Sequence, residues 1–335
     1  MLIFFKYFTF FHICHNLTVT ISLSALKRVF HSPFQKMFHV EHFLFFSCYL
    51  FYLEVGCAII ITVIYKIILN MQEKGEKMGK IIAIVNQKGG VGKTTTTINL
   101  AAGIGKSGKR CLLIDIDPQG NSTSGLGISK RQIEHSSYDV IIGETDAADA
   151  IIKTKYKNVN ILPSSMDLAG AEVELVEVKE REQCLKKAVA IQRMNYDYIL
   201  LDCPPSLGML TINALVAADT VLVPIQCEYY ALEGLSQLMN SVRQIKRLYN
   251  SQIDIEGVLL TMYDGRLNLT QQVVREIKRF FPKKVFKTVI PRSVRLSEAP
   301  SYGEPIQYYD KNSKGAIAYD ELAAEIIKNN KKRGD

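Results

Sequence analysis

The chain has 335 residues, enough for one large α/β domain or two smaller ones, and a formal net charge of +8 at pH 7. Its seven cysteines include no C-x-x-C pair, which argues against a disulfide scaffold or a zinc site and fits a reducing cytosol. The positive charge suits a polyanionic partner, nucleic acid or an anionic membrane surface, although a soluble protein without such a partner can have the same balance.

The first 77 residues differ in composition from the rest of the chain. Residues 1–70 are rich in Phe, Tyr, Ile and Leu and lack the period of an element with one wet face. Residues 43–69 are apolar enough for a membrane-spanning helix, but Glu54 near their middle would be costly in lipid. Three interpretations are open: a membrane anchor, a disordered hydrophobic arm, or upstream DNA translated from a start codon that was assigned too early.

Back-translation favours the third interpretation. Residues 74–76 (KGE) can be encoded AAA-GGA-GAA, which contains the ribosome-binding sequence AAGGAG shortly before the codon for Met78. Residues 37–42 (MFHVEH) can be encoded ATG-TTC-CAC-GTG-GAA-CAT, which contains the inverted repeat TGTTCCACGTGGAACA. We therefore expect residues 1–77 to be a non-native extension, or else a hydrophobic arm, and residues 78–335 to be a single domain. The genomic DNA, and a search for peptides from residues 1–70 in the native protein, test this hypothesis.

From residue 80 onward, apolar runs alternate with longer helical segments, which is typical of a parallel sheet with crossover helices. We therefore predict an α/β fold, a mostly parallel twisted sheet with helices on both faces, and a ligand beyond the carboxyl ends of the strands. The predicted strands cover residues 81–86, 111–115, 159–162, 198–202, 220–224, 255–262 and 285–289. The predicted helices cover residues 94–107, 168–194, 208–217, 232–248, 270–281 and 315–329.

A glycine-rich segment joins the first predicted strand to the first predicted helix, and it reads Lys88, Gly89, Gly90, Val91, Gly92, Lys93, Thr94, Thr95. The glycines let backbone N–H groups turn toward phosphate oxygens, and the helix N-terminus adds its positive end. Lys93 is suited to reach the β- and γ-phosphates of ATP, and the Thr94 hydroxyl to bind Mg²⁺. The pattern predicts the phosphate-binding loop of a P-loop NTPase, but Gln87 stands where the usual pattern has glycine.

Carboxylates follow two of the later predicted strands. Asp115 and Asp117 come at the end of strand 111–115, and Asp202 ends the apolar strand 198–202. Carboxylates at this edge of the sheet can orient Mg²⁺ and an attacking water, so we expect Thr94, Asp115 and Asp202 to be the metal ligands. One of the first two could instead only cap the strand end. Cys203 is expected to be a small core residue and not a nucleophile.

A basic region follows strand 255–262, and clusters of this kind neutralise DNA phosphates without reading sequence. A solvated helix face explains residues 275–279 nearly as well. Arg266 and Arg295 are the stronger DNA-binding candidates, because each lies in a loop after a predicted strand. The region comprises Arg266, Arg275, Lys278, Arg279, Lys283, Lys284, Lys287, Arg292 and Arg295.

Taken together, these motifs resemble the ParA/Soj family of chromosome and plasmid partitioning ATPases, in the MinD-like group with deviant P-loops. The resemblance covers residues 78–330 and rests on residues 88–95, 115–125, 202–206, 223–234 and 291–300. It implies that Lys88 contacts the partner's phosphates in an ATP-dependent homodimer. It also implies that Asp117, with Lys88 and Lys93, supports hydrolysis, and that Arg266 and Arg295 belong to the dimer's DNA-binding surface. Pro291 and Ser293 lie where the family holds adenine, although relatives often have Asn at 293.

The resemblance further implies ATP and Mg²⁺ as cofactors, nonspecific double-stranded DNA and the protein ParB (Spo0J) as partners, and weak hydrolysis that ParB stimulates. The implied process is chromosome or plasmid segregation, with an influence on replication initiation or sporulation, in the cytoplasm on the nucleoid. ParB binds a site of the form TGTTYCACGTGRAACA, which the back-translated repeat fits.

The alternative is a MinD-like membrane-associated ATPase that regulates division-site placement. Residues 317–329 lack the bulky aromatics of an amphipathic membrane helix and are followed by charged residues, so we expect no stable membrane association from residues 78–335. An iron–sulfur reductase would need paired cluster cysteines, which the sequence does not offer.

Overall fold

The computed structural model describes residues 78–228 and 231–332, all within one compact unit. The segment 1–77, with the apolar stretch 43–69 and the expectations about it, lies outside the described residues. The strands are β1 (Lys80–Ile84), β2 (Cys111–Asp115), β3 (Ile152–Lys153), β4 (Val159–Leu162), β5 (Tyr198–Asp202), β6 (Thr220–Gln226) and β7 (Asp254–Thr261).

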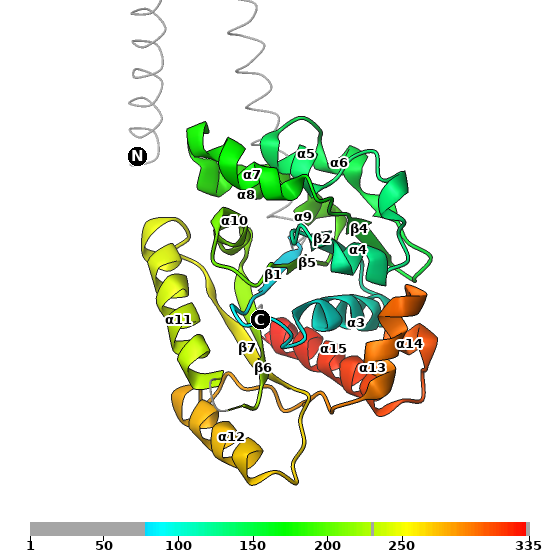
Figure 1. Ribbon diagram of the computed structural model, residues 1–335, viewed down its shortest axis with the longest axis vertical. Helices are drawn as coiled ribbons and strands as arrows, with labels where there is room; N and C mark the ends of the chain where they lie inside the picture. Colours follow the sequence, from blue (N-terminus) through cyan, green and yellow to red (C-terminus); the bar gives the residue numbers. More distant parts are fainter. Residues whose placement is uncertain (1–77, 229–230, 333–335) are drawn as a thin grey trace, which may run out of the picture. The chain divides into compact units, whose positions relative to one another are not determined.

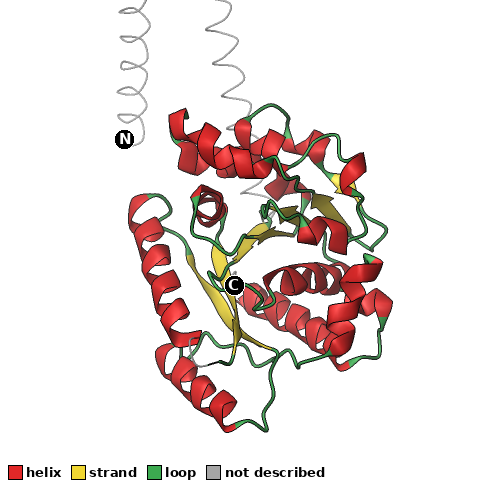
Figure 2. Cartoon of the chain, in the orientation of Figure 1, coloured by secondary structure: helices red, strands yellow, loops and turns green. Residues whose placement is uncertain are grey.

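The helices outnumber the strands and differ widely in length (Figures 1 and 2). They are α3 (Lys93–Lys106), α4 (Asn121–Gly125), α5 (Ser137–Ile142), α6 (Ala147–Ala150), α7 (Leu168–Glu174), α8 (Cys184–Ala188), α9 (Gln192–Asn195), α10 (Met209–Ala217), α11 (Ala231–Leu248), α12 (Asn268–Phe280), α13 (Val294–Glu298), α14 (Ile306–Tyr309) and α15 (Lys314–Lys332). Short 3₁₀ turns are η1 (Lys130–Gln132), η2 (Leu175–Glu177), η3 (Arg181–Gln183) and η4 (Ala299–Tyr302).

The strands form one seven-stranded sheet in the order β3-β4-β2-β5-β1-β6-β7. Every neighbouring pair is parallel except β3 with β4. The central strand β1 reads KIIAI and is buried on both faces, as expected of a strand covered by crossover helices. The predicted α/β fold with a mostly parallel sheet is confirmed.

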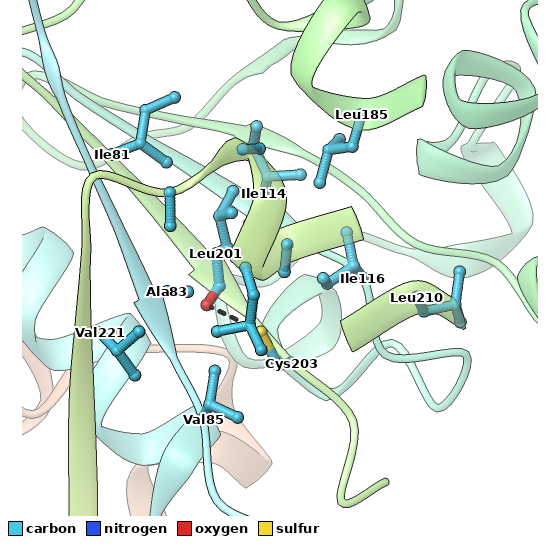
Figure 3. Packing of buried hydrophobic residues seen from close by; sticks show 14 of the residues in the cluster. Ile81, Ala83, Val85, Ile114, Ile116, Leu185, Leu201, Cys203, Leu210 and Val221 are labelled. Atoms are coloured by element: carbon cyan, nitrogen blue, oxygen red, sulfur yellow. Dashed lines mark hydrogen bonds between the residues drawn. The ribbon is translucent and has the colours of Figure 1, made fainter. Parts of the chain in front are cut away.

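Two hydrophobic cores lie on the two faces of the sheet. Alternate residues of β1 point to opposite sides: Ile81 and Ala83 join the core under α7, α8, α10, α11 and α12, and Ile82 and Ile84 join the core under α3 and α15. Figure 3 shows the first core, in which the Cys203 thiol packs among aliphatic side chains and lies 3.7 Å from the Leu201 carbonyl oxygen. Helices therefore cover both faces, as predicted.

The C-terminal helix α15 packs against α3, the helix that follows the glycine-rich loop. Gly103 of α3 permits the close approach, since a Cβ atom there would lie 2.9 Å from Ala323 Cβ and 3.2 Å from the Tyr319 carbonyl oxygen. The Tyr319 hydroxyl lies 3.2 Å from Thr96 Oγ1. Among the described residues, no helix has both the length and the apolar character needed to cross a membrane.

Two predicted elements are wrong. The single helix over 168–194 is instead a series of short helices, because Val178 is extended and Glu180 has a left-handed backbone with φ 58°. The strand over 285–289 is reduced to one bridge between Val258 and Val285. There the backbone N–H groups of Lys287 and Thr288 donate to Glu325 of α15, at 2.9 and 3.0 Å, and not to a strand.

Candidate functional site

The glycine-rich loop lies at the carboxyl end of β1 and leads into α3. Gly90 and Gly92 have φ of 73° and 88°, a conformation that strains residues with a side chain. A Cβ atom on Gly89 or Gly90 would have no heavy atom within 4 Å, so the surface of the loop is open at the place where a phosphate chain would lie. Thr261 of β7 supports the loop from beneath by donating to the Val91 carbonyl oxygen at 2.8 Å. The loop is therefore open on the side of Gly89 and Gly90, where a phosphate group could approach its backbone.

Lys93, the first residue of α3, is folded back over this loop. Its ammonium group is 3.2 Å from the Lys88 carbonyl oxygen, and the residue is only 7% exposed. Burial lowers the pKa of Lys93, while the nearby carboxylate charges of Asp202 and Asp117 act in the opposite direction. A cation held in a poorly solvated position is suited to bind phosphate, since a triphosphate would replace the lost hydration.

Asp202 ends β5 beside the loop and is fully buried. It accepts hydrogen bonds from Ser122 Oγ at 2.6 Å and Thr97 Oγ1 at 3.1 Å, and the Thr94 hydroxyl is close enough to act against the rise of its pKa. The structure thus brings together Thr94 and Asp202, two of the three predicted metal ligands. In residues 78–228 and 231–332, no three His, Cys, Asp or Glu side chains gather as a metal site, so Mg²⁺ would also depend on phosphate oxygens.

Asp115, the third predicted ligand, lies next to Asp202 in the register of β2 and β5, and both are fully buried. Its Oδ2 accepts from Thr123 N at 2.8 Å and Thr123 Oγ1 at 2.7 Å, and its Oδ1 accepts from Asp117 N at 3.2 Å. Burial and the Asp202 charge raise the pKa of Asp115. A metal ion bound to Asp115 would have to displace these donors, two of which are backbone N–H groups. The donors to Asp202 are side-chain hydroxyl groups, of Ser122 and Thr97.

Asp117 follows β2 and is 7% exposed. Its Oδ1 accepts from Gln119 N at 2.9 Å, and its charge acts on both Lys93 and Asp202. Cys203 is buried beside these groups. Burial raises its pKa well above the ordinary thiol range, so the thiol stays protonated and is a core residue, not a nucleophile.

Two residues of this region carried no signal strong enough to be singled out in the sequence. Ser164 follows β4 and bonds both to Thr123 and to the Asp117 carbonyl oxygen. Glu228 follows β6 and forms an ion pair with Lys88. Both follow the carboxyl ends of strands that neighbour β2 or β1, so knowledge of the strand order would have pointed to them. The residue types alone do not, because a serine or a glutamate after an apolar strand is common.

A cavity of about 250 Å³ lies beside the N-terminus of α3, between α4 and η4. Pro291 and Ser293, the predicted adenine contacts, do not line it. Pro291 forms a bridge with Tyr263, just beyond β7, whose Thr261 contacts the loop. The cavity is lined by Thr94, Thr95, Ile98, Asn99, Asn121, Ser124, Ala299, Pro300 and Glu304.

Next to this cavity, the backbones after α4 and after η4 are in direct contact. Gly127 and Gly303 both have positive φ, of 77° and 63°. A Cβ atom on Gly303 would lie 2.6 Å from the Gly127 Cα atom, so neither position has room for a side chain. The Tyr156 hydroxyl donates to the Gly303 carbonyl oxygen at 2.5 Å and fixes the contact from a third side.

Arg266 and Arg295, the DNA-binding candidates, are both exposed and both paired with carboxylates of their own chain. Arg266 donates through Nε and Nη2 to Asp264, at 2.9 and 2.7 Å, and this holds the pKa of Asp264 well below its usual range. Arg295 donates to Glu298 at 3.0 Å. DNA phosphates would therefore compete with these carboxylates for the guanidinium groups.

Comparison with known proteins gives a consistent family. Residues 79–255 match a family model described as an AAA domain. The chain is 58% identical over 252 residues to the sporulation initiation inhibitor protein Soj of Bacillus subtilis (strain 168), covering 75% of this chain and 100% of that protein. It is 50% identical over 251 residues to the chromosome partitioning protein ParA of Myxococcus xanthus (strain DK1622), covering 75% of this chain and 89% of that protein.

Solved structures share the fold and include nucleotide complexes. The cobyrinic acid a,c-diamide synthase of Mycobacterium smegmatis, with bound ATP analog and magnesium, is 35% identical with a TM-score of 0.67, covering 76% of this chain and 96% of that one. The cell division ATPase MinD of Pyrococcus furiosus is 29% identical with a TM-score of 0.62, covering 75% of this chain and 99% of that one.

Proposed function

Because the chain belongs to the Soj/ParA family of chromosome partitioning ATPases, we propose that it uses ATP to form a homodimer that binds DNA nonspecifically and works with ParB in chromosome or plasmid segregation. The chain is an ATPase of the P-loop class, and its cofactors are ATP and Mg²⁺. The proposal implies a cytoplasmic protein that associates with the nucleoid, and it carries over an influence on replication initiation or sporulation.

The observation that carries the proposal is the open glycine loop with Lys93 above it and Thr94, Asp202 and Asp117 at its edge. Backbone N–H groups of residues 89–94 would bind the phosphates, and Lys93 would neutralise them. Mg²⁺, held by Thr94 and Asp202, would stabilise charge on the phosphates. Asp117 would orient the attacking water, and Asp115 supports the turn in which Asp117 lies by accepting a hydrogen bond from Asp117 N.

Two substitutions separate binding from hydrolysis. Lys93→Ala removes the buried cation over the loop, so we expect ATP affinity to fall by at least about 100-fold. Asp117→Ala leaves the loop intact, so ATP binding and dimerisation should persist while turnover falls by at least about 100-fold. Isothermal titration and a single-turnover assay measure the two effects. Normal hydrolysis by Asp117→Ala would exclude its proposed role, and normal ATP affinity of Lys93→Ala would exclude this loop as the binding site.

The DNA-binding part of the proposal concerns Arg266 and Arg295. Replacing both by alanine should weaken ATP-dependent binding to duplex DNA of any sequence and lower the slope of log affinity against log salt by about 2. A matched control is the double replacement of Lys109 and Arg110 by alanine. It removes the same charge just before the amino end of β2. Equal DNA binding in ATP and in ADP would contradict the nucleotide switch, and wild-type binding by the arginine variant would contradict the assignment of this surface.

The MinD-like alternative requires a C-terminal helix with a free apolar face. In α15 that face is used within the chain, because Ala316, Tyr319, Leu322, Ala323 and Ile326 are buried, in the core that includes residues of α3. This observation favours the partitioning function. Vesicle flotation with anionic lipid tests it: the ATP-bound protein should stay in the unbound fraction.

A further inference from the structure

Asp117 belongs to a tight turn whose main chain is held from outside the turn. Gly120 N donates to the Asp117 carbonyl oxygen at 2.8 Å and closes the turn, with Gly120 at φ 58°. The same carbonyl oxygen accepts a second hydrogen bond, from Ser164 Oγ, at 2.7 Å. Ser164 comes from the end of β4, which pairs with β2, the strand that leads into the turn.

Ser164 also closes a ring of hydrogen bonds around the turn. Its backbone N–H donates to Thr123 Oγ1 at 3.0 Å, and Thr123 Oγ1 donates to Asp115 Oδ2 at 2.7 Å. Asp115 Oδ1 accepts from Asp117 N at 3.2 Å, which completes the ring from Asp117 through Ser164, Thr123 and Asp115 back to Asp117. Ser164, Thr123 and Asp115 are 0% exposed, so water cannot replace a missing member without entering the core.

We propose that Ser164 is a positioning residue for hydrolysis: its hydroxyl fixes the peptide of Asp117 and thereby the direction of the Asp117 carboxylate. The phosphates are held by a different segment, residues 88–94, with which Ser164 forms no hydrogen bond among the described residues. Loss of the Ser164 hydroxyl therefore acts on the chemical step and leaves ATP binding in place. The inference rests on the proposed role of Asp117 in hydrolysis.

Full-length Ser164→Ala tests the inference by the separation of kcat from KM. A small misplacement of a group that orients the nucleophile costs about tenfold to a hundredfold in rate, so we expect kcat to fall by at least about tenfold with the KM for ATP and the ATP affinity within about twofold of wild type. Ser165→Ala is the matched control, because Ser165 Oγ contacts Ser136 and Asp167 and not the Asp117 turn. This control should keep wild-type kcat.

A second pair of variants keeps the test informative if Ser164→Ala does not fold. Thr123→Val removes the hydroxyl that joins Ser164 to Asp115 at nearly constant volume, and Thr123→Ser retains it. We expect low kcat for Thr123→Val, restored in Thr123→Ser. Wild-type kcat in Ser164→Ala or Thr123→Val, or parallel losses of ATP affinity and kcat, would overturn the inference. If Asp117→Ala itself turns over normally, the proposed role of Asp117 fails instead.

Discussion

At the scale of single residues, two buried carboxylates make the nucleotide-free protein sensitive to pH. Burial raises the pKa of Asp115 to about 7 and of Asp202 to about 6, and the Asp202 charge adds to the effect on Asp115. In the unfolded chain both pKa values are about 4. The folded protein therefore binds these protons more tightly than the unfolded chain does, so its stability falls as the pH rises from about 4 to about 7.

Asp115→Asn should reduce this pH dependence. Between pH 4.5 and 7, the free energy of unfolding of the wild type should fall relative to that of the variant by on the order of 1–4 kcal/mol. Urea unfolding without nucleotide measures the difference, with Asp149→Asn, an exposed aspartate of α6, as the control. Identical slopes for the wild type and Asp115→Asn would show that Asp115 is not protonated in this range.

The ion pair between Lys88 and Glu228 gives a second prediction at this scale. Both side chains are partly exposed, at 40% and 47%, so the pair contributes only about 0.2–1 kcal/mol. If Lys88 must leave Glu228 to contact a partner's phosphates, Glu228→Gln removes a competitor. The ATP concentration at half-maximal dimerisation should then fall by about two- to fivefold.

The matched control for Glu228→Gln is Glu180→Gln, which breaks a somewhat more exposed pair with Lys187, far along the chain from the loop. It should dimerise as the wild type does when followed by light scattering. A rise in the required ATP concentration for Glu228→Gln would mean instead that Glu228 assists the dimer.

At the scale of helices and strands, the contact of α3 with α15 depends on Gly103. A methyl group there would lie 2.9 Å from Ala323 Cβ, closer than such atoms pack, so Gly103→Ala should lower the free energy of unfolding by about 1–3 kcal/mol. Gly234→Ala in α11 is the control. Its Cβ would meet nothing within 4 Å, so the same change should raise stability by up to about 1 kcal/mol. Thermal unfolding distinguishes the two signs.

The sequence predicted the central strands because β1, β2 and β5 are buried on both faces and read as continuous apolar runs. Elements near the sheet edge were harder to predict. In the predicted strand 285–289, Phe286 N donates to Val258 O, and Ile290 N donates to Leu260 O. The segment therefore advances four residues where β7 advances two, so it cannot pair as a regular strand. No local sequence pattern encodes this mismatch.

The residues of the candidate site likewise fall into those that the sequence predicted and those that it did not. The glycine loop, Asp117 and Asp202 follow strands directly and carry recognisable patterns. Ser164 and Glu228 act through partners about 40 and 140 residues away, Ser164 with Thr123 and Glu228 with Lys88. Only the order of strands in the sheet brings such partners together, and a single sequence does not state that order.

At the scale of the whole molecule, the touching backbones of Gly127 and Gly303 connect the segment beside the proposed ATP site with the segment that carries Arg295, the proposed DNA-binding residue. Gly127 follows α4, whose Thr123 bonds to Asp115, and Gly303 follows α13 and η4, which carry Arg295. With no space between these backbones, α4 cannot move toward η4 without carrying it along. If Arg295 binds DNA as proposed, the contact between Gly127 and Gly303 would transmit a movement of α4 to the segment that carries this arginine.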